Sequence, residues 1–179
     1  MPVGKKVITA DVRVSENLNR LLVLPRDHNN YIRLIKQYID ERQPYKLAIS
    51  LNAVDNNTRS DIMPITKKWN IEMIINELER YPSDKKNMIM LEYVLLKDIN
   101  DSLKDAEQLS KYANHLRCKV NVIPFNTIGN EYSRPDEDVI NQFINVLHKN
   151  QRHYQTLVRW SKGIDIDAAC GQLSTNTIK

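Results

Sequence analysis

One stretch near the end of the chain, "DIDAACGQL" at residues 165–173, carries the residue type best suited to covalent chemistry. Cys170 follows two acidic residues and lies between two alanines and a glycine. Asp165 or Asp167 can cap a helix that begins here, and the dipole of such a helix favours a thiolate in its first turn. The two carboxylates oppose that effect. From these residues alone Cys170 is a small packed residue, a metal ligand, half of a disulfide or a nucleophile.

The cysteine count narrows these alternatives. The chain has 2 cysteines, Cys118 and Cys170, and they lie 52 positions apart. Two cysteines are too few for a disulfide scaffold, and this spacing does not match a zinc or iron–sulfur site made by one chain. We therefore predict no metal site in this chain.

Polar residues follow the ends of several predicted strands. Ser50, Leu51 and Asn52 end the run "KLAISL" and its continuation, and Asn126 ends "KVNVIPF". Ordinary turns explain these residues equally well, because serine and asparagine cap helices and close turns. Glu92 lies inside the apolar run "MLEYVLL", so it is either a charge at a sheet edge or an inward polar group of a site.

Apolar runs rich in β-branched residues alternate with segments of helical periodicity, and this pattern predicts an α/β fold. Strands are expected at residues 5–12, 45–53, 87–96, 118–126 and 153–160, and helices at 29–42, 70–81, 101–116 and 135–150. These βα units predict about five mainly parallel strands, too few to close an eight-stranded barrel. In such sheets, sites lie at the carboxyl ends of the strands, where the polar residues above are found.

Helix caps and composition complete this prediction. Asn70 is expected to cap a helix that begins at Ile71, Asp101 to cap one that begins at Ser102, and Pro135 to occupy a first helical turn. The length of 179 residues with 41% hydrophobic residues indicates one domain, residues 1–173, followed by a frayed polar tail at 174–179. The net charge of +4 is compatible with a polyanionic partner such as RNA. No membrane-spanning run or signal sequence is evident, so we expect a cytoplasmic protein.

Four separated motifs, in order, resemble the C-terminal part of the dual-specificity radical SAM RNA methyltransferases. They are "LAISLNAVDNNTRSDIMPITKKWNIE", "LEYVLLKDINDS", "CKVNVIPFN" and "GIDIDAACGQL", and the resemblance runs from about Tyr45 to Leu173. That family methylates carbon 2 of an adenine in large-subunit (23S) ribosomal RNA and in tRNA, and a sister family methylates carbon 8. The resemblance implies that the predicted strands form part of an incomplete radical SAM (βα) barrel.

The resemblance also implies roles for single residues. Ser50, Leu51, Asn52 and Asn126 match family positions that contact S-adenosylmethionine. Cys170 matches the family's methyl carrier, which takes a methyl group from one S-adenosylmethionine. A radical made from a second S-adenosylmethionine then abstracts a hydrogen atom from that S-methyl group, and the resulting methylene adds to the adenine ring. Such a carrier needs a soft, nucleophilic sulfur. Ribosomal RNA and tRNA are the implied partners.

The chain departs from the family in one major respect, because it has no CxxxCxxC motif to hold a 4Fe–4S cluster. Two hypotheses follow. In the first, this is the C-terminal half of a methyltransferase, whose cluster comes from a complementary N-terminal chain, and the isolated chain is inactive. In the second, it is a non-catalytic remnant that acts at most as an RNA- or cofactor-binding module.

Overall fold

The computed structural model describes residues 12–15, 21–23, 31–42, 46–82, 88–126 and 132–160. Within these ranges six strands form one open sheet in the order β2-β1-β3-β4-β5-β6. Strands β3 to β6 are parallel, whereas β1 is antiparallel to both β2 and β3. The predicted α/β fold with a mainly parallel sheet is confirmed. The strands are β1 (Val12–Ser15), β2 (Leu21–Val23), β3 (Lys46–Ser50), β4 (Met90–Leu95), β5 (Lys119–Pro124) and β6 (Gln155–Val158).

Helices connect the parallel strands, as the periodicity predicts. Each of the four predicted helices is present, and a further α-helix with an adjoining 3-10 turn follows β3. The helices are α1 (Tyr31–Asp40), α2 (Asn56–Ile62), α3 (Ile71–Glu79), α4 (Leu103–Leu116) and α5 (Glu137–Asn150), with the 3-10 helix η1 at Pro64–Lys67.

The structure describes little of the first predicted strand. That strand is expected at residues 5–12, of which residues 1–11 lie outside the described ranges, and Val12 is the first residue of β1. The prediction misses β2. Only five residues separate Ser15 from Leu21, which is too short for the crossover that a parallel connection requires. The two strands therefore pair as an antiparallel hairpin.

Helix capping follows the sequence in one case and differs in two. Asn70 caps α3, because its side-chain oxygen accepts a hydrogen bond from the backbone N–H of Met73 at 2.9 Å. At α4 the cap is Ser102 rather than Asp101, since Ser102 and Asp105 form a reciprocal capping box. Pro135 lies before Asp136, the N-cap of α5, and therefore outside the first turn.

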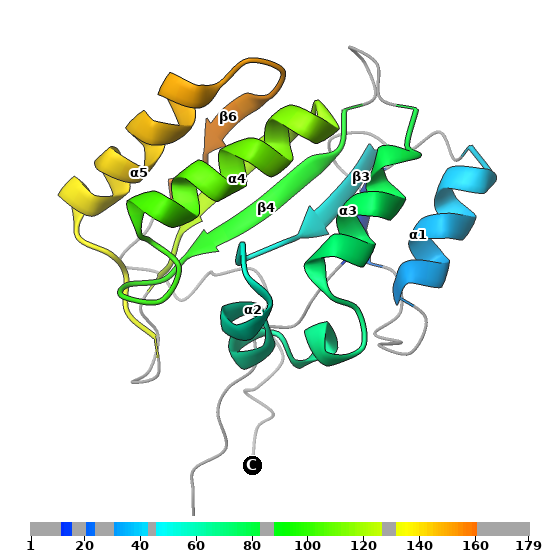
Figure 1. Cartoon of the computed structure of the whole chain (residues 1–179), viewed down its shortest axis with the longest axis horizontal. Helices are drawn as coiled ribbons and strands as arrows, with labels where there is room; N and C mark the ends of the chain where they lie inside the picture. Colours follow the sequence, from blue (N-terminus) through cyan, green and yellow to red (C-terminus); the bar gives the residue numbers. More distant parts are fainter. Residues whose placement is uncertain are drawn as a thin grey trace, which may run out of the picture.

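The described helices that pack on the parallel sheet all lie on one of its faces (Figure 1). Figure 1 shows α3 and α4 lying over β3 and β4 on the near side, with α1 and α5 flanking them. Side chains alternate between the two faces of a strand. Leu91, Tyr93 and Leu95 of β4 are fully buried in the core with these helices, as are Val120 and Val122 of β5.

The opposite face carries the alternate residues of the same strands. On β4 these include Glu92, and on β5 they include Asn121. We call this side of the sheet, defined by Ser50, Glu92 and Asn121, the inner face.

No described helix is long and apolar enough to cross a membrane.

Candidate functional site

The chain leaves β3 through a tight turn at residues 50–52, which we call the strand-end turn. Ser50 is the last residue of β3, and the backbone N–H of Leu51 donates to the carbonyl of Glu92 at 2.9 Å. Asn52 has a φ of 57°, in the left-handed region that asparagine tolerates better than most residues. This conformation turns the chain away from the sheet and toward α2, which lies beyond the carboxyl ends of β3 and β4 (Figure 1).

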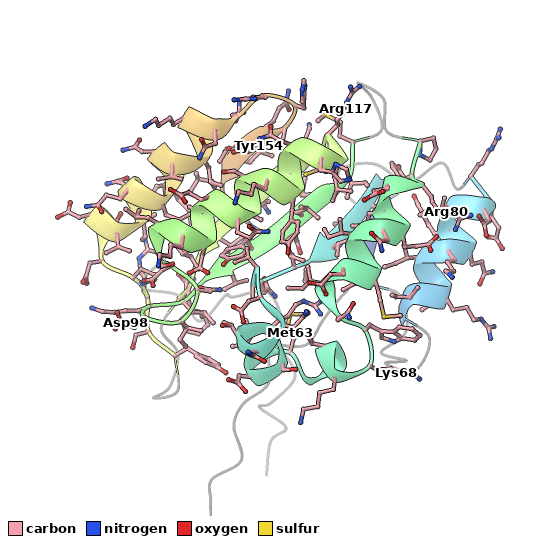
Figure 2. The ribbon with its side chains drawn as sticks, viewed as in Figure 1. Met63, Lys68, Arg80, Asp98, Arg117 and Tyr154 are labelled. Atoms are coloured by element: carbon pink, nitrogen blue, oxygen red, sulfur yellow. The ribbon has the colours of Figure 1, made fainter. Side chains whose placement is uncertain are left out.

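The side chain of Asn52 is bonded within the protein. It is 1% exposed, its oxygen accepts from the N–H of Val94 at 2.9 Å, and its amide nitrogen donates to the sulfur of Met63 at 3.3 Å. Figure 2 shows Met63 beside α2 in the lower part of the view, where Asp98 is also found, whereas Arg117 and Tyr154 lie in the upper part. Asn52 therefore joins the end of β3 to β4 and to α2.

Asn100, which the sequence did not single out, fixes the same turn from the other side. It is 1% exposed. Its amide nitrogen donates to the carbonyl of Asn52 at 2.7 Å and to that of Val94 at 2.8 Å, and its oxygen accepts from the N–H of Leu96 at 2.7 Å. The hydroxyl of Tyr93 donates to the carbonyl of Asn100 at 2.8 Å. One buried side chain thus links the ends of β3 and β4 through three hydrogen bonds.

Arg59 of α2 holds the remaining carbonyls of the strand-end turn. It is fully buried, and its guanidinium donates to the carbonyl of Leu51 at 2.9 Å and to that of Ser50 at 3.3 Å. The same group donates to the hydroxyl of Thr66 at 2.8 Å. Burying a cation is unfavourable unless hydrogen bonds satisfy its donors, and the planar guanidinium can satisfy several at once. Arg59 therefore fixes the direction of two consecutive peptide groups.

The other predicted residues of this site lie at different depths. Asn126 follows β5, directly after Phe125, whose N–H donates to the carbonyl of Leu95 at 3.1 Å. Its side chain is partly exposed, and within the described ranges it makes no hydrogen bond. Ser50, Asn52 and Asn126 thus share the carboxyl edge of the parallel sheet. Cys170 lies outside the described residues, so its position relative to this edge stays a prediction.

Glu92 is an inward polar group, and the alternative of a sheet-edge charge is wrong. Strand β4 lies between β3 and β5, with Glu92 paired to Ser50 on one side and Asn121 on the other. Its relative exposure is 8%. The prediction from sequence left both readings open because periodicity does not show which strands flank a given strand.

Cys118 is a packed residue, as expected from its place before a strand. It is fully buried, its thiol contacts the carbonyl of Ala113 at 3.7 Å, and burial raises the pKa of the thiol to about 12. A thiol with this pKa is almost entirely protonated at neutral pH and is a poor nucleophile or metal ligand. Within the described ranges no group of three or more His, Cys, Asp or Glu side chains could hold a metal ion.

Comparison with models of known protein families gave no match. The chain is similar to the dual-specificity RNA methyltransferase RlmN of Helicobacter pylori (strain G27), with 45% identity over 129 residues, which cover 72% of this chain and 36% of the relative. RlmN of Desulfosudis oleivorans is 45% identical over 134 residues, covering 74% of this chain and 36% of the relative. The crystal structure of a radical SAM methyltransferase from Sphaerobacter thermophilus matches with a TM-score of 0.70 and 35% identity, over 79% of this chain and 41% of that one.

This chain is homologous to the C-terminal region of RlmN. The resemblance inferred from the four motifs is therefore confirmed, and the fold agrees with that of the solved radical SAM methyltransferase. The chain spans little more than a third of the length of the RlmN relatives that it matches.

The radical SAM relationship implies S-adenosylmethionine and a 4Fe–4S cluster, and the residues of this chain fit these two groups differently. The strand-end turn and Asn126 offer a fixed polar edge of the kind that binds a nucleotide cofactor. The cluster does not fit, because it needs at least three thiolates and the sequence has 2 cysteines, of which Cys118 is buried with a raised pKa.

Proposed function

We propose that this chain carries the S-adenosylmethionine-binding strand ends and the methyl-carrier cysteine of a radical SAM RNA methyltransferase. Its substrates in this proposal are an adenine of 23S ribosomal RNA and one of tRNA, in the cytoplasm. The observation that carries the proposal is the fixed strand-end turn, which lies in the region homologous to RlmN. Arg59 and Asn100 hold it through five hydrogen bonds, four to backbone carbonyls and one from a backbone N–H. A fixed turn binds a cofactor without losing much conformational freedom.

The residues of the site have different roles in this proposal. Ser50 and Asn126 contact the cofactor directly, because they lie at the carboxyl edge and Asn126 makes no hydrogen bond within the described ranges. Leu51 and Asn52 act by holding the backbone of the turn, since Leu51 is fully buried and both polar groups of the Asn52 side chain are bonded. Cys170 carries the methyl group, as its match to the family motif implies.

A complete methyltransferase of this kind needs cluster ligands that the sequence does not contain. We propose that a complementary protein segment supplies them and that this chain by itself does not cleave S-adenosylmethionine reductively. The second candidate, a module that binds cofactor or RNA without chemistry, is favoured by the same cysteine count. The two differ in one outcome: adding the N-terminal part of an RlmN relative to the chain restores RNA methylation in the first and leaves it absent in the second.

Isothermal titration of the chain with S-adenosylmethionine tests the binding step. Asn126→Ala should weaken binding roughly 2- to 10-fold, as expected for the loss of one or two ordinary hydrogen bonds. Asn145→Ala is the matched control, because Asn145 lies exposed on α5 and should leave the affinity unchanged. Absence of binding by the wild-type chain would contradict the proposal.

Anaerobic reconstitution with iron and sulfide tests the cluster step. The isolated chain should retain no stoichiometric iron and form no 5′-deoxyadenosine, because it lacks three available thiolates. Stoichiometric iron together with 5′-deoxyadenosine from the pure chain would show that it does hold a working cluster.

A further inference from the structure

The inner face of the sheet carries a row of three polar residues. The parallel register pairs Ser50 of β3 with Glu92 of β4, and Glu92 with Asn121 of β5, so the three lie side by side on neighbouring strands. Their relative exposures are 7%, 8% and 8%. They point away from the helices, because the residues that alternate with them form the core against α3, α4 and α5.

Asn121 differs from the other buried asparagines. The side chains of Asn52 and Asn100 use both their oxygen and their nitrogen in hydrogen bonds. In the described part of the chain, the carboxamide of Asn121 makes none, even with the neighbouring Glu92. Buried polar groups are nearly always hydrogen-bonded, and an exception requires an explanation such as a ligand. The unmatched donors and acceptor of Asn121 therefore indicate a bound polar partner on the inner face.

The surroundings of Asn121 limit the chemistry of this partner. A carboxamide presents one donor and one acceptor on the same edge, which matches the N6 amino group and N7 of adenine. Adjacent strands lie about 4.8 Å apart, so the side chains of Glu92 and Asn121 fall within the width of one purine. A phosphate group without a proton offers only acceptors and would leave the carboxamide oxygen of Asn121 unmatched. A nucleobase edge supplies both a donor and an acceptor, so it fits this carboxamide better than a phosphate does.

We propose that Asn121 pairs with the edge of an adenine ring bound on the inner face. This inference rests on the proposed function, which supplies two sources of that ring: the cofactor S-adenosylmethionine and the RNA substrate. Ser50 belongs to both the strand-end turn and the polar row, so a cofactor held at Ser50 lies about two strand spacings, roughly 10 Å, from Asn121. Asn121 is then a residue that recognises the base rather than one that braces the fold.

Two probes separate the sources. S-adenosylhomocysteine represents the cofactor, and a short single-stranded RNA containing one adenosine represents the substrate. Each is compared with its 7-deaza analogue, which lacks the N7 acceptor, by titration against the wild-type chain, Asn121→Leu and the control Asn145→Leu. For the probe whose adenine is recognised, the 7-deaza change and Asn121→Leu should each weaken binding roughly 5- to 150-fold. Their effects should not add, because both remove the same contact.

Each outcome decides the inference. Loss confined to S-adenosylhomocysteine assigns Asn121 to the cofactor, and loss confined to the RNA assigns it to the substrate. Unchanged affinity of wild type for both 7-deaza probes overturns the inference while leaving the proposed function intact, and this comparison needs no variant to fold. A wild-type chain that binds neither probe overturns the proposed function together with the inference. The side-chain amide resonances of Asn121, identified by their absence in Asn121→Leu, should shift only with the recognised probe.

Discussion

Replacing Asn100 by alanine should damage both the stability of the protein and its strand-end turn. The substitution removes three hydrogen bonds, of 2.7, 2.8 and 2.7 Å, and leaves the carbonyls of Asn52 and Val94 and the N–H of Leu96 without this partner. An ordinary intramolecular hydrogen bond contributes about 1 kcal/mol net, and a buried group left unsatisfied adds to the loss. We therefore expect the free energy of unfolding to fall by about 3 kcal/mol.

Asn114 provides a matched control for this experiment. It also makes three hydrogen bonds, to the carbonyl of Asn150 at 2.9 Å and from the N–H groups of Arg152 and His153, each at 3.0 Å. It lies on α4 near its carboxyl end, far along the helix from the cap at Ser102, and it is partly exposed. Asn114→Ala should therefore lower the free energy of unfolding by a smaller amount, about 1–2 kcal/mol.

Urea unfolding followed by far-ultraviolet circular dichroism measures both changes, and titration with S-adenosylmethionine measures the turn. Asn100→Ala should lose cofactor affinity as well as stability, because Asn100 donates a hydrogen bond to the strand-end turn. Asn114→Ala should lose stability alone, because the hydrogen bonds of Asn114 go to residues 150, 152 and 153. A loss below about 1 kcal/mol for Asn100→Ala, or equal loss of affinity in the two variants, would refute the reasoning.

Three further outcomes follow from buried groups. Because burial raises the pKa of Cys118 to about 12, limited iodoacetamide treatment at pH 8 followed by mass spectrometry should label Cys170 first, and preferential labelling of Cys118 would contradict this. Arg59→Met should lower the free energy of unfolding by about 2–4 kcal/mol and Thr66→Val by about 1 kcal/mol in urea titrations, since the first leaves two carbonyls of the turn unmatched. Burial raises the pKa of the Tyr93 hydroxyl well above 10, so this group ionises first in the unfolded chain and the free energy of unfolding falls as pH rises above 10. Tyr93→Phe should lack this part of the fall. At pH 7 its free energy of unfolding should be about 1 kcal/mol lower, because the hydrogen bond to the carbonyl of Asn100 is lost.

The sequence predicted the parallel part of the fold well, because its signals there are strong and local. Apolar runs such as residues 87–96 and amphipathic segments such as 101–116 have a clear period, and the structure confirms them as β4 and α4. The N-terminal hairpin was missed because β2 has three residues, too few for any period to appear. The position of a cap was missed by one residue at α4, since Asp101 and Ser102 are both good caps and only the capping box with Asp105 decides between them.

The residues that hold the site were harder to predict than those that form its edge. Ser50, Asn52 and Asn126 are visible in the sequence because they follow strands. Arg59 and Asn100 are not, because a charged residue in a helix and an asparagine in a loop are ordinarily exposed. Both side chains are buried in the folded protein. Arg59 contacts the carbonyl of Leu51, 8 positions away, and Asn100 contacts the carbonyl of Asn52, 48 positions away, and only the packed fold brings these groups together. The position of Asn121 beside Glu92 could not be predicted for a related reason, because it depends on which strands pair and in which register.

Cofactor binding and radical chemistry depend on different parts of such an enzyme, and the contacts of this chain keep the two separate. The backbone of the strand-end turn is fixed by Arg59, Asn100 and the side chain of Asn52, through bonds that lie entirely between residues 50 and 100. None of these bonds involves a thiol or a metal ligand. The geometry that would hold a cofactor therefore does not require the cluster that would reduce it. For this reason a chain without cluster ligands can keep a well-formed binding edge, and a measured affinity for S-adenosylmethionine would be evidence for the edge and not for catalysis.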